Sequence, residues 1–144
     1  MNSHTLFRLF NEIGIVNQLS SNRFARALPE GLSLAQFSVL NNFVRLGGTR
    51  SPKQLADAFQ VTKGAMTNTL NRLQENGLIL IEPDPVDRRA KVVQITPAGR
   101  EMREQALQGA FPAMLDLQGL LTDSEIEAML ASLTKLRTHL DRNR

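Results

Sequence analysis

Apolar residues recur every three or four positions through most of this chain, a spacing that predicts amphipathic helices separated by short breaks. The breaks fall where helix-ending residues gather, as at Pro29 to Gly31 and at Gly47 and Gly48. The chain is therefore predicted to be mainly helical. The helices are expected over residues 3–28, 33–46, 51–59, 62–76, 96–118 and 122–144.

Helix starts are marked by capping boxes, in which a Ser or Thr is followed three residues later by Gln or Glu. They begin at Ser33, Ser51 and Thr122. Pro112 lies inside the fifth helix, where it removes one backbone hydrogen bond and is expected to kink the helix between Gly109 and Phe111. Residues expected to point inward from this helix are Met102, Ala106, Ala110, Met114 and Leu117.

A different pattern lies between the fourth and fifth helices. Residues 78–81 and 92–95 are rich in Leu, Ile and Val and predict two strands of a hairpin. The segment between them is polar, and Pro83 and Pro85 favour an exposed loop over a hydrogen-bonded ladder. Residues 49–51 are candidates for a short third strand.

Composition excludes several classes of function. The 144 residues are 42% hydrophobic and 22% charged with a net charge of +3, which is typical of a globular protein. There is no cysteine for a disulfide, thiolate site or thiol redox sensor, and two histidines are too few for a metal cluster. We expect no cofactor, no membrane span and no signal peptide, and hence a cytoplasmic location. No nucleophile-and-base spacing points to an enzyme.

The fourth predicted helix has two contrasting faces. Met66, Leu70 and Leu73 form its apolar stripe. The opposite face carries small, polar or cationic side chains, as a helix in a DNA major groove requires. The alternative is an ordinary solvated helix face. These candidate DNA contacts are Lys63, Gly64, Thr67, Asn68, Asn71 and Arg72, to which we add Ser51 at the start of the preceding helix.

The hairpin loop carries two adjacent cations. Arg88 and Arg89 could reach a phosphate or a narrow minor groove, where a guanidinium is attracted. Asp87, two residues before Arg89, is placed to hold that arginine in one orientation. We interpret the hairpin as a wing beside a recognition helix, the alternative being a loop tip that only improves solubility.

The chain carries four characteristic segments, in this order: LAQFSVL, SPKQLADAFQVTKGAMTNTLNRLQENGLI, DPVDRRAKVVQITPAGR and LTDSEIEAML. With them, the sequence resembles the MarR (multiple antibiotic resistance regulator) family over nearly its whole length. The resemblance implies a winged helix-turn-helix core at residues 31–96 and a helical dimerisation region at residues 1–30 and 97–144. The long apolar first helix independently suggests a partner chain, although it could pack on its own domain. Candidate dimerisation residues are Leu6, Phe10, Ile13, Ile126, Leu130, Leu133 and Leu140.

Family likeness further implies a transcription regulator, usually a homodimeric repressor, that binds double-stranded DNA at a pseudo-palindromic operator. It also implies release by a small phenolic or aromatic effector. The chain departs from the family in having no cysteine for hydroperoxide sensing, no Trp or Tyr to line an effector cleft, and Pro112 within a usually straight helix. The alternatives are a winged-helix protein-interaction module, an enzyme fragment and an effector-independent regulator.

Overall fold

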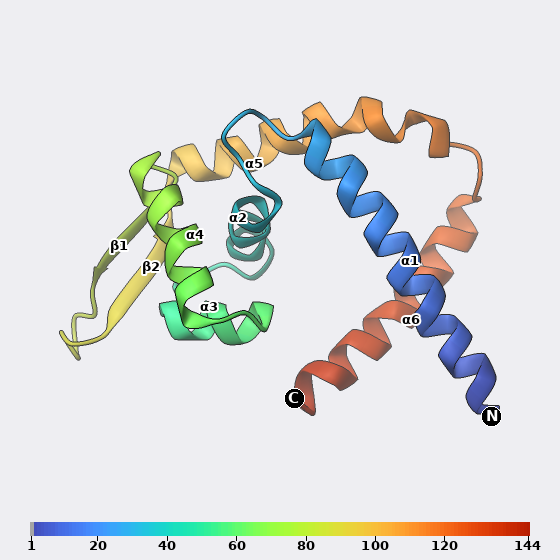
Figure 1. Cartoon of the computed structure of the whole chain (residues 1–144), viewed down its shortest axis with the longest axis horizontal. Helices are drawn as coiled ribbons and strands as arrows, with labels where there is room; N and C mark the ends of the chain where they lie inside the picture. The colour runs from blue at the N-terminus through green and yellow to red at the C-terminus, as the bar shows by residue number, and fades with distance from the viewer. Residues whose placement is uncertain (1) are drawn as a thin grey trace. The chain divides into compact units, whose positions relative to one another are not determined.

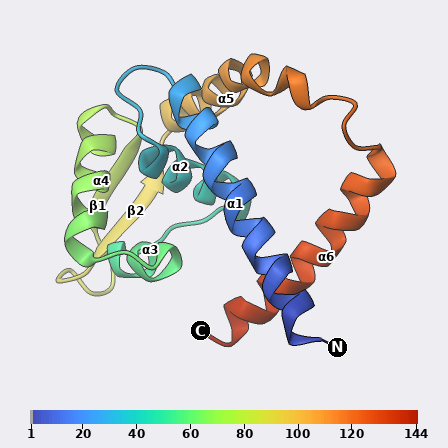
Figure 2. The same cartoon turned by 45° about the vertical axis from the view of Figure 1, so that its right-hand side comes forward.

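The computed structural model describes residues 2–144, which separate at Phe111 and Pro112 into two compact units. Figures 1 and 2 show the elements of the chain. Within these described residues, six α-helices and a two-stranded sheet confirm the mainly helical fold with a small hairpin. In chain order the elements are α1 (Ser3–Ala27), α2 (Leu34–Leu46), α3 (Pro52–Phe59), α4 (Lys63–Glu75), β1 (Ile79–Pro83), β2 (Lys91–Ile95), α5 (Pro97–Ala110), the 3-10 helix η1 (Phe111–Leu117) and α6 (Asp123–Arg142).

The predicted helix starts are confirmed by their hydrogen bonds. Ser33, Ser51 and Thr122 each form a complete capping box with the residue three positions later. At the start of α4, the Thr62 hydroxyl oxygen accepts the Ala65 N–H at 3.1 Å. After α4, Gly77 has φ +70°, a conformation that a glycine adopts without steric cost, and the chain turns there into β1.

The hairpin is longer than the sequence predicts. β1 and β2 pair antiparallel, with Ile79 opposite Ile95 at one end and Pro83 opposite Lys91 at the other. The expectation that Pro83 belongs to an unpaired loop was therefore wrong. A proline is tolerated at the end of an edge strand because its missing N–H need not complete the ladder. Arg50 forms one isolated bridge with Val93, which reduces the predicted third strand to a single pair.

The core of the first unit lies between α2, α3, α4 and the hairpin. In Figure 1 the end of α2 faces the viewer, with α3 below it and α4 between α2 and the hairpin. At its edge, Phe24 of α1 packs edge-on against Phe37 of α2 with ring centroids 4.8 Å apart. The largest side chains that are fully buried in this core are Val39, Leu40, Phe43, Leu55, Leu70, Leu73, Ile79 and Val93.

Pro112 disrupts the fifth helix where the sequence places the disturbance, but the form differs. The α-helix ends at Ala110, and the chain continues as the 3-10 helix η1 in place of a kinked α-helix. Ala106 and Ala110 are buried as expected, whereas Leu117 is exposed and its predicted inward position was wrong. The tighter turn of a 3-10 helix changes which side chains share a face, so the α-helical spacing no longer applies beyond Phe111.

Both terminal helices keep apolar side chains in solvent. Neither α1 nor α6 contains a fully buried residue. Among the candidate dimerisation residues, Phe10, Ile126, Leu130, Leu133 and Leu140 are exposed, and Leu6 and Ile13 are half-buried. Within residues 2–144, no helix has the length and apolar character needed to cross a bilayer.

Candidate nucleic-acid interface

Helix α4 presents the polar face that its sequence predicts. Met66, Leu70 and Leu73 are buried against the rest of the first unit. Because these three hold the apolar face inward, the opposite face must point to solvent. All six candidate DNA contacts on that face are exposed: Lys63, Gly64, Thr67, Asn68, Asn71 and Arg72.

Two hydroxyls of α4 are engaged by their own helix. The Thr67 hydroxyl donates to the Lys63 carbonyl oxygen at 2.8 Å, and the Thr69 hydroxyl donates to the Ala65 carbonyl oxygen at 3.1 Å. Each hydroxyl oxygen keeps lone pairs that can accept another hydrogen bond. Thr67 therefore presents an oriented acceptor and a methyl group on the exposed face of α4.

The late part of the exposed face meets the start of α2. Asn68, Thr69 and Arg72 line a surface hollow of about 500 Å³ together with Ser33 and Gln36. Arg72 is thus at the border of the polar face, beside the capping box of α2, rather than at its centre.

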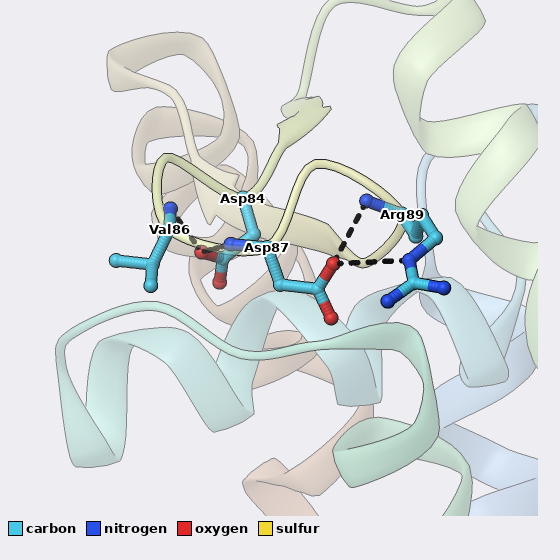
Figure 3. Close-up of polar contacts among 4 residues, drawn as sticks. All are labelled: Asp84, Val86, Asp87 and Arg89. Atoms are coloured by element: carbon cyan, nitrogen blue, oxygen red, sulfur yellow. Dashed lines mark hydrogen bonds and ion pairs between the residues drawn. The ribbon is translucent and has the colours of Figure 1, made fainter.

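The wing loop is held by hydrogen bonds within itself. Figure 3 shows that the carboxylate oxygen Oδ1 of Asp84 accepts the N–H groups of Val86 at 2.8 Å and Asp87 at 3.1 Å. The Asp84 N–H donates to the Ala90 carbonyl, and the Ala90 N–H donates to the Asp87 carbonyl, each at 3.0 Å. These four hydrogen bonds give a seven-residue exposed loop a defined conformation.

Asp87 orients Arg89 as the sequence suggested. Its Oδ1 atom accepts the Arg89 N–H at 3.1 Å and lies 3.7 Å from the guanidinium Nε of the same residue (Figure 3). The Arg89 side chain is 97% exposed and that of Asp87 is 62% exposed. The pair therefore restrains a guanidinium that points into solvent and touches little else of the protein.

The electrostatics of the loop follow from these contacts. Hydrogen bonds from the N–H groups of Val86 and then Asp87 lower the pKa of Asp84 below its ordinary value. The carboxylate is consequently charged throughout the neutral range and keeps accepting both bonds. Asp84 therefore stabilises the turn at Val86 and Asp87.

Ser51 lies apart from the α4 face, at the base of the wing. Its hydroxyl accepts the Gln54 N–H at 3.1 Å as the cap of α3. It lines a hollow of about 270 Å³ with Arg50, Asp84 and Lys91. The sequence analysis did not select Arg50 or Lys91 as candidates, because the hollow forms only when the loop before α3 meets the hairpin.

The position of Arg103 is fixed by a contact that could not be predicted from the sequence. The Arg103 guanidinium of α5 donates from Nε and a terminal nitrogen to Asn41 Oδ1 of α2, at 3.2 and 3.0 Å. The two residues are 62 positions apart. Arg103 is thereby committed to joining two helices. Across residues 2–144, no group of three or more His, Cys, Asp or Glu side chains could hold a metal ion.

Known proteins share both the sequence and the fold. The family model described as "MarR family" matches residues 30–90, which run from the turn after α1 to the end of the wing loop. The multiple antibiotic resistance protein MarR of Salmonella typhimurium is 35% identical over 108 residues, covering 69% of this chain and 74% of that protein. The chain belongs to the MarR family.

A second relative of this MarR-family chain is an uncharacterized HTH-type transcriptional regulator, YdgG of Bacillus subtilis. It is 30% identical over 101 residues, and the match spans 69% of the MarR-family chain and 66% of YdgG. The chain is accordingly a MarR-family transcriptional regulator.

Solved structures extend the likeness to nearly the full length of the chain. The transcriptional regulator BldR of Sulfolobus solfataricus is similar with a TM-score of 0.80 and 27% identity, over 96% of this chain and 99% of BldR. A mutant MarR of E. coli complexed with operator DNA has a TM-score of 0.71 and 29% identity, over 92% and 95% of the two chains. BpsR of Bordetella bronchiseptica, whose DNA binding is regulated by 6-hydroxynicotinic acid, has a TM-score of 0.71 and 25% identity, over 90% and 98%.

Proposed function

We propose that this MarR-family regulator binds double-stranded DNA as a homodimer and represses transcription from a pseudo-palindromic operator. The observation that carries the proposal is the pairing of an exposed polar face on α4 with an oriented, solvent-exposed Arg89 on the wing. The similar structure of a mutant E. coli MarR bound to operator DNA supports the same function.

In this proposal the exposed face of α4 lies in the major groove. Gly64 adds no bulk, so the helix backbone can approach the bases closely. Thr67 and Asn68 bring a methyl group, an acceptor and an amide, which are the groups that read base edges. Lys63 and Arg72, at the two ends of the face, contact phosphates and fix the register of the helix.

Arg89 enters the adjacent minor groove. A narrow minor groove concentrates negative potential, which favours an inserted guanidinium. Because Asp87 restrains Arg89 before DNA arrives, less side-chain freedom is lost on binding. Arg88 and Ser51 complete the contacts to the backbone, with Ser51 donating from the hydroxyl that caps α3.

The dimer forms through residues 1–30 and 97–144, and residues 31–96 bind DNA. Support comes from the apolar side chains that α1 and α6 leave in solvent, among them Phe10 and Leu130, since faces of this kind mark association sites. A two-fold axis between the copies would set the two α4 helices about 34 Å apart, one turn of DNA.

A small phenolic or aromatic ligand releases the repressor by favouring a different spacing of the two α4 helices. The regulation of BpsR by 6-hydroxynicotinic acid supports this part of the proposal. With no Trp or Tyr in the chain, such a ligand would meet Phe and aliphatic walls.

The test begins with selection of binding sites from random duplexes. Fluorescence anisotropy on the selected site at several salt concentrations, and sedimentation of the free protein, then measure affinity and assembly. We expect a dimer, a two-fold symmetric site, and a binding constant that falls steeply with salt because phosphate contacts release counterions. If the protein is a monomer, or is a dimer that binds no duplex at low ionic strength, the result would favour a protein-interaction module.

Ligand release is tested separately. A panel of phenols and aromatic acids is added to the preformed complex, and DNA affinity and the thermal midpoint of the free protein are measured. At least one compound should lower DNA affinity and raise the midpoint. A panel without effect on either would favour an effector-independent regulator.

A further inference from the structure

The wing tip carries an apolar side chain that the rest of the molecule leaves in water. Val86 is 95% exposed, more than any other large apolar side chain among residues 2–144. Within residues 31–96 the other exposed ones are Leu46, Val61 and Leu80, at 55%, 43% and 40%. The exposed apolar side chains on α1 and α6 would be covered by the second copy in the proposed dimer, whereas nothing in that dimer is proposed to cover Val86.

The position of Val86 is set by its neighbours. Its N–H is bound by the Asp84 carboxylate, and the preceding Pro85 has a fixed φ. A β-branched side chain has few rotamers, so the methyl groups of Val86 lose little freedom when they meet a surface. Figure 3 shows Val86 and Arg89 on opposite sides of Asp87, so the loop offers an apolar and a cationic side chain together.

We propose that Val86 packs against the deoxyribose edge of the minor groove that receives Arg89, and that it adds affinity independent of salt. The inference rests on the proposed DNA-binding function and names a further contact residue for it. Two residues separate Val86 from Arg89 along the loop, so Val86 stays within reach of a groove wall when Arg89 lies inside the groove. The C–H surfaces of the sugars form those walls, and other minor-groove proteins insert apolar side chains into this groove as wedges between base steps.

The contact differs from the arginine contacts in its physical signature. Arg89 displaces counterions, so its loss should flatten the dependence of binding on salt. Val86 buries methyl groups, and that contribution does not involve counterions. Truncation to alanine removes two carbon atoms at a partly buried position, from which we expect affinity to fall about three- to tenfold.

The experiment measures anisotropy of the selected duplex over a salt series for wild type, Val86→Ala, Val86→Ile and Arg89→Ala. Leu80→Ala is the matched control, because Leu80 is an exposed apolar side chain outside the loop. We expect Val86→Ala to lose about three- to tenfold at every salt concentration with the slope of log K against log salt unchanged. Val86→Ile should bind at least as tightly as wild type, Leu80→Ala should bind like wild type, and Arg89→Ala should reduce the slope.

Three results would overturn the inference: wild-type affinity of Val86→Ala, a loss that vanishes as salt changes, or an equal loss in Leu80→Ala. Amide spectra of the free variants check that the loop keeps the Val86 and Asp87 hydrogen bonds to Asp84. Failure of the proposed function itself would look different, since wild type would then show no salt-dependent binding. If wild type and Arg89→Ala behave as expected and Val86→Ala matches wild type, only the inference fails.

Discussion

Gly99 in the first turn of α5 lies directly against the backbone carbonyl of Leu78, at the start of the hairpin. A Cβ atom at residue 99 would overlap the Leu78 oxygen and come within 2.8 Å of the Ile95 side chain. The same Leu78 carbonyl accepts the Thr96 N–H at 3.1 Å, and the Thr96 hydroxyl donates to the Gly77 carbonyl at 2.7 Å. The exit from α4 and the entry into α5 are therefore packed backbone to backbone.

Gly99→Ala should destabilise the protein by about 1–3 kcal/mol or more, because the obstacle is backbone and cannot rotate away. Urea unfolding measures the change. The matched control is Gly64→Ala, a helical glycine around which a Cβ would find nothing within 4 Å. That variant should be as stable as wild type or slightly more so. Equal stability of the two variants would show that α5 can move away from the hairpin.

The conformation of the wing loop should depend on pH through the ionisation of Asp84. Its pKa is lowered by the Val86 and Asp87 N–H groups, so the charged form is favoured in the folded loop. The stabilisation is present above the ordinary aspartate pKa of about 3.9 and is lost as pH falls through the lowered value. In an NMR titration, the Val86 and Asp87 amide shifts should follow the Asp84 carboxyl. Asp84→Asn should remove that transition, and amide shifts that move only with some other group would contradict the assignment.

Arg89→Ala should weaken operator binding by about 1–3 kcal/mol without changing the unfolding midpoint. The side chain is almost fully exposed, so the fold does not depend on it. The neighbouring Arg88→Ala is the comparison, since no carboxylate contact is assigned to Arg88 and its loss should be smaller. Anisotropy at fixed salt and urea unfolding measure the two quantities. Equal losses for the two arginines would mean that charge alone, and not the Asp87 pairing, matters.

The Arg103–Asn41 contact should stabilise the packing of α5 on α2. Arg103→Met keeps most of the side-chain length and removes two hydrogen bonds to Asn41 together with the ion pair to the exposed Glu104, with an expected cost of about 1–2 kcal/mol. Arg100→Met, at an exposed position of the same helix, is the control and should cost little. Urea unfolding of the two variants measures the difference in their free energy of unfolding. If both variants have the same urea midpoint as wild type, water replaces the Arg103–Asn41 hydrogen bonds without loss of stability.

Local chemistry determined the elements of this protein. Capping boxes at Ser33, Ser51 and Thr122 set helix starts because their hydrogen bonds join residues three positions apart. The two faces of α4 follow from helical spacing, which also identified its buried Met66, Leu70 and Leu73. Asp87 beside Arg89 was predicted for the same reason, since both partners lie in one short loop.

Only the tertiary structure decided the features that depend on distant residues. Pro83 entered a strand because Lys91 pairs with it, and its own local preference is for a loop. Asn41 and Arg103 meet across 62 positions, and Arg50, Ser51 and Lys91 share a hollow only after the hairpin folds back on α3. Sequence spacing encodes contacts within a helix or turn, whereas these contacts arise from packing among several elements.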